Sequence, residues 1–172
     1  MSNFQEYDKN ALSKQLNNII DDSRDKTPKK KMYFAGPWFD IKTAMLYDAC
    51  QSIVKLNEAK NRYIVSFPRD INFPSTKETF NEDVRLIKEC DVVVALVDTK
   101  DVGTAWEIGM AYVLGKPIYL LGLDSSTFKS KTNLMLAYTG KCFTLDKFAK
   151  FLTKGLKSDE FLKFSEKWED IE

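Results

Sequence analysis

A nine-residue segment of the chain, DVGTAWEIG at positions 101–109, places two carboxylates at the start of an apolar stretch. Glu107 is the only charged residue between positions 102 and 114. On a helix it would share a face with residues at i+3, i+4 and i+7, which here are Met110, Ala111 and Leu114. The positive end of the helix dipole favours an ionised carboxylate near the helix start, and a desolvated carboxylate that stays ionised can act as a nucleophile.

The same segment also allows a purely structural role for Glu107. Thr104 and Glu107 have the spacing of a capping box, in which the threonine caps a helix and the glutamate reaches back to the N-cap amide. The spacing alone does not separate this role from a chemical one.

A second acidic candidate is Asp83, in the segment FNEDVRLIKECD, which has helical spacing and leads into a strand-like run. Its structural alternative is a surface acid in the first turn of a helix. Asp98 and Asp101 also suit loop or capping roles, and Tyr33 and Trp38 suit core or rim roles. Only their convergence on one edge of a sheet would make these residues a site.

The chain has no histidine, which removes several kinds of chemistry. The Ser-His-Asp and Cys-His systems and the commonest metal ligand are excluded. The three cysteines, Cys50, Cys90 and Cys142, lie far apart without a CxxC pair, so we expect buried free thiols. We predict no metal and no organic cofactor, and any catalysis must use carboxylates, tyrosines, lysines or an unassisted thiol.

The composition favours one domain that acts on small molecules. The chain has 172 residues, 44% of them hydrophobic, and a formal net charge of +1 with interleaved signs. That balance argues against nucleic-acid and anionic-membrane partners. No apolar run approaches 18 residues and the first residues do not resemble a secretory signal, so we expect a cytoplasmic protein.

Strand-like and helical segments alternate along the chain. Short apolar runs at 32–36, 63–68, 91–98, 116–123 and 142–145 predict strands, and stretches with helical spacing lie at 40–59, 76–90, 104–114, 126–138 and 146–156. This order predicts an α/β fold: one Rossmann-like (flavodoxin-like) domain with a parallel five-stranded sheet and helices on both faces. We place this domain at 29–157, between a polar N-terminal appendage at 1–28 and a helical tail at 158–172.

In such a sheet, ligands bind beyond the carboxyl ends of the strands. The loops expected there are GPWFD at 36–40, PRDINFP at 68–74, DTKDVGT at 98–104 and LDSS at 123–126. The third loop carries Asp98 and Asp101 and leads into the helix of Glu107.

Four segments together resemble the nucleoside 2-deoxyribosyltransferase family. They are KKMYFAGPWF in the first strand, NEDVRLIKECDVVVALVD, DVGTAWEIGMAYVLGKPIYLL around Glu107, and TNLM at 132–135. The resemblance spans about residues 30–138. Its DxGTxxExGxAxxxGKP pattern, arriving after YFAGPWF, is far more specific than a lone glycine motif.

The resemblance implies an enzyme that exchanges the nucleobase of a 2′-deoxyribonucleoside by double displacement. It implies that Glu107 attacks C1′, that Tyr33 holds this glutamate in position, and that Asp83 protonates the departing base. The substrate contacts that it implies are Asp101, Asn133, Phe34, Gly36, Trp38, Gly103 and Met135, with Phe34 and Trp38 forming an aromatic wall for the base. Asn133 would come from a neighbouring subunit, so the resemblance also implies a homo-oligomer with shared sites.

Elementary chemistry agrees with this assignment. Retaining cleavage of a glycosidic bond needs one carboxylate as nucleophile and one acid on the leaving group. A 2′-deoxy sugar lacks the electron-withdrawing hydroxyl that would destabilise the cationic transition state. The chain can therefore perform this reaction without histidine.

Two segments of the chain depart from the family pattern, and two functions other than base exchange stay open. Residues 1–28 and the tail KSDEFLKFSEKWEDIE do not match the family pattern, so we assign no role to Glu172. A related hydrolase acting on 2′-deoxynucleoside 5′-monophosphates would want serine and arginine in the loop after the first strand, where GPWFD has neither. A non-catalytic nucleotide-binding module would use Glu107 only as a capping residue.

Overall fold

The computed structural model describes residues 29–56, 63–71, 75–99, 101–129 and 134–154. The expected appendage at 1–28, the expected tail at 158–172 and Asn133 lie outside the described residues.

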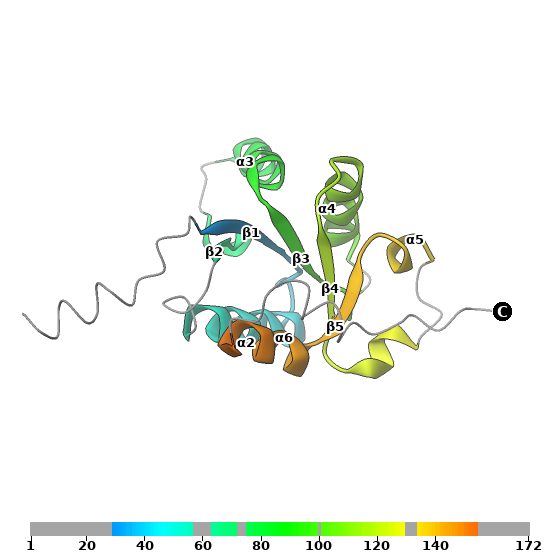
Figure 1. Cartoon of the computed structure of the whole chain (residues 1–172). Coiled ribbons are helices and arrows are strands. Elements are labelled where there is room, and N and C mark those ends of the chain that lie inside the picture. Colours follow the sequence, from blue (N-terminus) through cyan, green and yellow to red (C-terminus); the bar gives the residue numbers. More distant parts are fainter. Residues whose placement is uncertain (1–28, 57–62, 72–74, 100, 130–133, 155–172) are drawn as a thin grey trace, which may run out of the picture.

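A parallel five-stranded sheet in the order β2-β1-β3-β4-β5 forms the centre of the molecule (Figure 1). Its strands are β1 (Lys30–Ala35), β2 (Tyr63–Ser66), β3 (Val92–Leu96), β4 (Ile118–Gly122) and β5 (Lys141–Thr144). Helices α3 (Thr76–Glu89) and α4 (Val102–Val113) cover one face, and α2 (Ile41–Leu56) and α6 (Leu145–Lys154) cover the other. This arrangement confirms the predicted flavodoxin-like fold, and the first four strands match their predicted ranges to within two residues.

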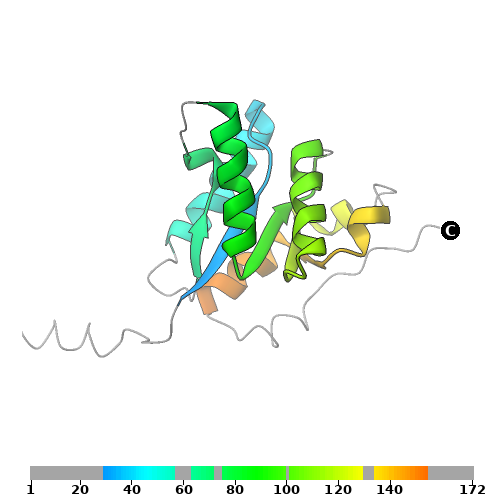
Figure 2. The same cartoon turned by 90° about the horizontal axis from the view of Figure 1, so that it is seen from above.

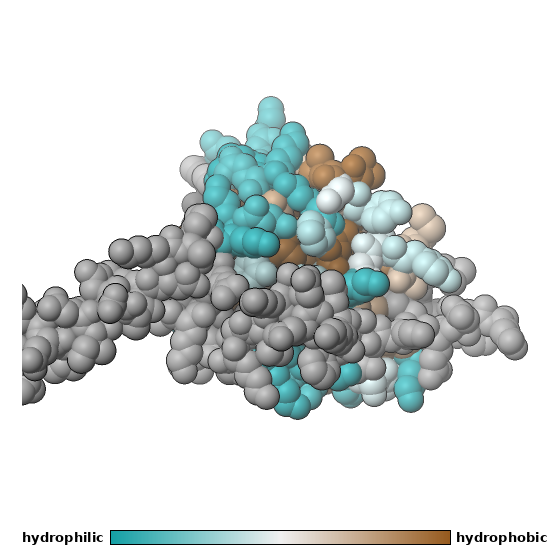
Figure 3. Space-filling view, viewed as in Figure 1, coloured by the Kyte–Doolittle hydropathy of each residue, from teal (hydrophilic) through white to brown (hydrophobic). Residues whose placement is uncertain are grey.

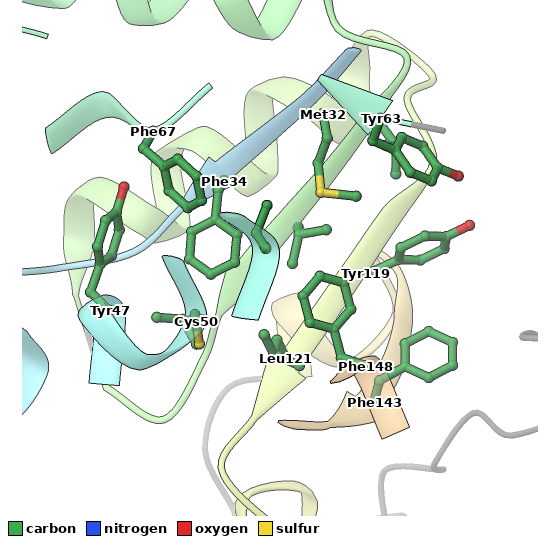
Figure 4. Packing of buried hydrophobic residues seen from close by; sticks show 14 residues of the cluster. Met32, Phe34, Tyr47, Cys50, Tyr63, Phe67, Tyr119, Leu121, Phe143 and Phe148 are labelled. Carbon is green, nitrogen blue, oxygen red and sulfur yellow. The ribbon is translucent and has the colours of Figure 1, made fainter. Parts of the chain in front are cut away.

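The apolar strands follow from burial on both faces of the sheet. All five residues of β3, VVVAL, are buried, as is usual for a central parallel strand covered by helices. In β1, alternate side chains enter different cores: Met32 and Phe34 pack toward α2 and α6, whereas Tyr33 and Ala35 pack toward α3 and α4. Figure 4 shows the first of these cores, in which the rings of Phe34, Tyr47 and Phe67 pack against one another.

Helix α4 has well-defined ends. At its start, the Asp101 side chain accepts a hydrogen bond from the Thr104 amide at 2.6 Å. At its end, Gly115 adopts a φ of 66°, the amide of Gly115 bonds to Tyr112, and the amide of Lys116 bonds to Ala111. This is a Schellman motif, which requires a residue that tolerates positive φ.

The predicted helix at 126–138 is wrong as a single element. The structure has a 3-10 turn, η2 (Ser125–Phe128), and a separate one-turn helix, α5 (Leu134–Ala137). The Asp124 carboxylate accepts from the Ser126 amide at 2.7 Å, and the Asp98 carboxylate accepts from the Thr127 hydroxyl at 2.6 Å. These local bonds favour a tight turn over a continuous α-helix.

A second 3-10 turn, η1 (Pro68–Asp70), follows β2. Cys50, Cys90 and Cys142 are buried thiols outside any disulfide, which confirms the prediction for the cysteines. Within the described ranges, no helix has the length and apolar character needed to cross a bilayer.

Candidate active site

Glu107 lies on the inner side of α4 and faces β1. The Tyr33 hydroxyl donates a hydrogen bond of 2.5 Å to its Oε1 atom. Ala111, one turn further along this inner side, is fully buried against the sheet. The helix therefore directs the only carboxylate in its turns toward a strand residue that is 74 positions away in the sequence.

The capping-box alternative for Glu107 is wrong. Asp101 is the N-cap residue of α4, and its carboxylate accepts from both the amide and the hydroxyl of Thr104, at 2.6 and 2.8 Å. Thr104 therefore lies inside the helix and does not cap it. Because Asp101 satisfies the helix start, Glu107 is available to bind Tyr33 instead.

The surroundings of Glu107 favour its neutral form. Burial raises the pKa of Glu107 to about 7, and the charges of Asp83 and Asp101 add to this, while the hydrogen bond from Tyr33 lowers it. Burial and the adjacent Glu107 raise the pKa of Tyr33 well above its usual range, so this phenol stays protonated and donates. Glu107 therefore gains or loses its proton near neutral pH, while the Tyr33 hydroxyl donates a hydrogen bond to it.

Asp83 is the second acid of the site, and it comes from α3. Burial, followed by the nearby charge of Glu82, raises the pKa of Asp83 to about 6, while a hydrogen-bond contribution from Tyr33 lowers it. Its Oδ1 atom is buried without a hydrogen-bond partner among the described residues. A buried carboxylate oxygen of this kind is suited to receive a ligand or a proton.

Packing between α3 and α4 brings the two acids to one place. The helices lie side by side over the same face of the sheet (Figure 2). Phe80 of α3 contacts Trp106 of α4, with ring centroids 5.4 Å apart. Tyr33 lies beneath them on β1, and its phenol is electrostatically coupled to both acids. The structure thus groups Glu107, Asp83 and Tyr33 at one place.

Trp38 and Phe34, both predicted to form a wall for a base, pack against the same core cluster but differ in exposure. Trp38 is half-buried in the loop after β1, with its ring 5.5 Å from that of Tyr47. Phe34 is fully buried in the core toward α2 and α6, on the opposite side of the sheet from Tyr33. The prediction for Phe34 is therefore wrong, because alternate residues of a strand point to opposite faces.

Two other predicted substrate contacts, Gly36 and Gly103, have local structural roles, and a third, Met135, lies at the surface. Gly36 is buried, and a Cβ atom there would lie 3.0 Å from Leu96, so the loop after β1 passes close to β3. A Cβ atom at Gly103 would lie 3.2 Å from the Asp101 carboxylate, which shows how closely this cap fits the helix start. Met135 is 79% exposed and borders a groove on the far side of α4 from Glu107.

The sequence analysis did not predict a helix cap in the loop after β1. Asp40, the last residue of the GPWFD loop, accepts a 2.9 Å hydrogen bond from the Thr43 amide at the start of α2. Its backbone amide in turn donates to the Thr43 hydroxyl at 3.2 Å. An aspartate three residues before a threonine at a helix start was an available signal for this cap.

Among the described residues, no group of three acidic, histidine or cysteine side chains is arranged to hold a metal ion. The hydrogen-bonding atoms that face one another at the site are carboxylate and phenol oxygens.

Comparisons with known proteins identify the family of the chain. The family model for nucleoside 2-deoxyribosyltransferase matches residues 32–159. The match covers well over half of the chain, so the chain belongs to the nucleoside 2-deoxyribosyltransferase family.

Solved structures show the same fold at low sequence identity. A 2-deoxyribosyltransferase from Bacillus psychrosaccharolyticus is 23% identical, with a TM-score of 0.60 over 76% of this chain and 95% of the other. A 2-deoxyribosyltransferase from Leishmania mexicana is 24% identical, with a TM-score of 0.56 over 74% of this chain and 99% of the other. A search of curated proteins found no match.

Proposed function

We propose that this protein transfers a 2-deoxyribosyl group from one nucleobase to another, through a covalent intermediate on Glu107. The observation that carries this proposal is the partly buried Glu107 carboxylate, held by the Tyr33 hydroxyl beside the partly buried Asp83. Family membership supports the same reaction.

In the first half-reaction, Glu107 is the nucleophile. Because Tyr33 binds Oε1, we assign the attack on C1′ to Oε2. The bond from C1′ to the base nitrogen breaks, its electron pair stays with the base, and Asp83 supplies the proton that neutralises the base. The product of this step is a 2-deoxyribosyl ester of Glu107 and a free base.

This step needs Glu107 ionised and Asp83 protonated. The pKa is about 7 for Glu107 and about 6 for Asp83, and the charge of Asp83 contributes to the value of Glu107, so without a substrate a proton favours Glu107. A bound base would cover the exposed side of Asp83 and raise its pKa further, since desolvation disfavours the charged form. The phenol of Tyr33 donates to Glu107 and so favours the ionised state that attacks.

In the second half-reaction, the ionised Asp83 takes a proton from an incoming base. The base nitrogen then attacks C1′, and Glu107 leaves as a carboxylate. Two displacements at one carbon give net retention of configuration. No proton is gained or lost over the cycle, because Asp83 returns to its protonated state.

The substrates that we assign are 2′-deoxyribonucleosides and free nucleobases, with neither nucleic acid nor a membrane as partner. We retain Trp38, Gly36, Gly103, Asp101, Met135 and Asn133 as proposed substrate contacts. We also propose that the protein works in cytoplasmic nucleobase salvage as a homo-oligomer, in which Asn133 serves the site of a neighbouring copy.

Asp40 favours a free 5′-hydroxyl over a 5′-phosphate. The start of α2, a natural position for a phosphate, is capped by this carboxylate. The Thr43 amide lowers the pKa of Asp40 below its usual range, so the group is anionic at neutral pH and would repel a dianion. We therefore place nucleoside exchange ahead of hydrolysis of nucleotide monophosphates.

The test is to incubate the protein with 2′-deoxyinosine and free adenine and to separate the products by chromatography. We expect 2′-deoxyadenosine, with loss of exchange in Glu107→Ala. Intact-mass analysis after an acid quench, with donor alone, should show one added 2-deoxyribosyl group on the wild type. Release of free sugar without exchange would indicate a hydrolase, and no reaction with any of a panel of bases would favour a binding module.

A matched control is Glu89→Gln, which removes an exposed carboxylate paired with Arg85 on the same helix as Asp83. This variant should keep the exchange activity. Full exchange activity in Glu107→Ala would refute the assignment of the nucleophile.

A further inference from the structure

A second pocket lies at the amino ends of the strands, away from Glu107. We call it the amino-edge pocket, and its lining includes Lys30, Tyr63, Asp91, Lys116, Tyr119 and Lys141. Its volume of about 530 Å³ is in the range of about 300–1,000 Å³ that is usual for small-molecule sites. Tyr33 of the active site lies three residues beyond Lys30 in β1 and faces the other side of the sheet, so the two sites are separate.

The register of the strands places a tyrosine beside a lysine twice along this edge of the sheet. Tyr63 of β2 pairs with Lys30 of β1, and Tyr119 of β4 pairs with Lys141 of β5. Both tyrosines belong to the core toward α2 and α6, and they are only 8% and 7% exposed. Figure 4 shows their hydroxyl groups pointing out of this core. The buried rings therefore hold the two hydroxyl ends in fixed positions at the pocket that both residues line.

The charged groups of the amino-edge pocket are three lysines and one aspartate, so the pocket is positive. The Asp91 carboxylate accepts a 2.7 Å hydrogen bond from the Lys31 amide. The Lys116 ammonium group donates to two backbone carbonyl oxygens at the end of α3, both at 2.7 Å. The fold itself therefore uses the aspartate and one of the three lysines.

Lys30 and Lys141 are the two cations of the pocket that are open to a ligand. Both are exposed, and neither forms an ion pair with a carboxylate of the described residues. Strands β1 and β5 are three strand spacings apart, about 14 Å, and the four-carbon stems of the lysines allow both ammonium groups to turn toward one ligand between them. Two ammonium groups match the charge of a phosphate monoester, which approaches −2 at neutral pH.

The rest of the lining favours a phosphate that carries a flat ring over a simple anion. Val92 and Ile118, which are 4% and 3% exposed, form an apolar floor between the two open lysines. Tyr138 lines the same pocket and is 75% exposed, so its ring can stack on a planar group. A mostly apolar pocket with a few polar groups that fix orientation is the usual form of a site for an organic ligand.

We propose that the amino-edge pocket binds an aromatic organic phosphate of the size of a nucleoside 5′-monophosphate. Its phosphate lies between the ammonium groups of Lys30 and Lys141, and its ring packs against Tyr138. The hydroxyl ends of Tyr63 and Tyr119 lie beside the phosphate and add hydrogen-bonding groups. This site goes beyond the proposed exchange reaction, in which none of these five residues has a role.

The probe for this site is adenosine 5′-monophosphate, with binding to the full chain measured by isothermal titration calorimetry. It carries a 2′-hydroxyl, unlike the sugar of the proposed exchange substrates. Adenosine and inorganic phosphate are titrated separately, because each has only one half of the proposed ligand. We expect one site per chain for adenosine 5′-monophosphate, and affinities at least about 10-fold weaker for the two halves, since a charge-assisted contact or the ring contact is then missing.

Lys141→Glu and Lys30→Glu are the variants that test the phosphate contacts. Each should weaken the binding of adenosine 5′-monophosphate at least about 10-fold, because it replaces a charge-assisted contact with a repulsion. The matched control is Lys77→Glu, the same change of charge at an exposed lysine of α3 outside the pocket. Figure 3 shows the hydrophilic surface of this helix. Circular dichroism checks that all three variants are folded, and the control should bind as the wild type does.

Several results would overturn the proposal: no binding by the wild type at millimolar ligand, unchanged affinity in both pocket variants, or an equal loss in Lys77→Glu. Inorganic phosphate that binds as tightly as adenosine 5′-monophosphate would refute the ligand class. A repeat of the titration with excess 2′-deoxyinosine locates the site. Binding that 2′-deoxyinosine abolishes would place the nucleotide at Glu107 and refute the amino-edge pocket, whereas unchanged binding supports it.

Discussion

Replacing Glu107 by glutamine should make the protein more stable at alkaline pH. Burial raises the pKa of Glu107 from 4.5 to about 7, so the folded protein binds this proton more tightly than the unfolded chain does. The contribution of protonated Glu107 to the free energy of unfolding is fully present below about pH 4.5, and it is lost as the pH rises through about 7. Glutamine has the shape of the protonated acid, cannot ionise, and still accepts from Tyr33.

The magnitude follows from the size of the pKa shift. One pKa unit corresponds to about 1.4 kcal/mol, so ionised Glu107 destabilises the folded state by about 3 kcal/mol at pH 8 and by less than about 1 kcal/mol at pH 5. For a chain of this size, each kcal/mol shifts the melting temperature by about 2–4 °C. Glu107→Gln should therefore melt about 6–12 °C above the wild type at pH 8, with a much smaller difference at pH 5.

The measurement is urea unfolding at several pH values between 5 and 8, with thermal melting in parallel. Glu89→Gln is the control with the opposite sign, because Arg85 lowers the pKa of Glu89 and its contribution is present at neutral pH and lost in acid. A Glu107→Gln protein that is less stable than the wild type at pH 8 would refute the argument. So would a stability difference that is the same at pH 5 and pH 8, since it would show that Glu107 is not a desolvated acid.

Three further substitutions test other parts of the site and its helix. Tyr33→Phe removes the hydrogen bond that lowers the pKa of Glu107, so the acid limb of the rate profile for base exchange should move to higher pH; an unshifted limb would contradict this role. Asp101→Ala removes the cap on Thr104 and should cost about 1 kcal/mol in urea unfolding, whereas an unchanged midpoint would mean that another group caps α4. Gly115→Ala forces a side chain into a φ of 66° and should also lower the unfolding midpoint, by about 1 kcal/mol; no loss would argue against a strained position.

The fold could be predicted because its signals are local. The buried strand VVVAL and the alternation of strands with helical stretches follow from hydrophobic patterns over five to fifteen residues. The broken helix at 126–138 was missed because its termination depends partly on Asp98, a residue of another strand end, which binds Thr127. Contacts between distant segments of this kind leave no periodic mark in the sequence.

The site was only partly predictable for the same reason. The apolar neighbours of Glu107 indicated that it faces inward, but its bond to Tyr33 joins residues 74 positions apart. The capping spacing of Thr104 and Glu107 was misleading because Asp101 is a better cap one turn earlier. For Phe34 a usable signal existed: in a strand, neighbours point to opposite faces, so Phe34 and Tyr33 could not both face one site.

The sequence motif around Glu107 mostly specifies the position of one helix. Asp101 caps its start, Ala111 packs against the sheet, Gly115 ends it, and the Lys116 ammonium group donates to the carbonyl oxygens of Lys88 and Cys90 at the end of α3, both at 2.7 Å. These contacts determine where α4 starts, where it stops and how it lies beside α3. Because the helix is fixed in this way, the carboxylate stays in a position with little access to water. The loss of water raises its pKa, and the fixed position keeps it within hydrogen-bonding distance of the Tyr33 hydroxyl. The reactivity that we propose for Glu107 therefore depends on structural residues of the motif as much as on the acid itself, and loosening α4 at either end should return the pKa of Glu107 toward that of a solvated glutamate.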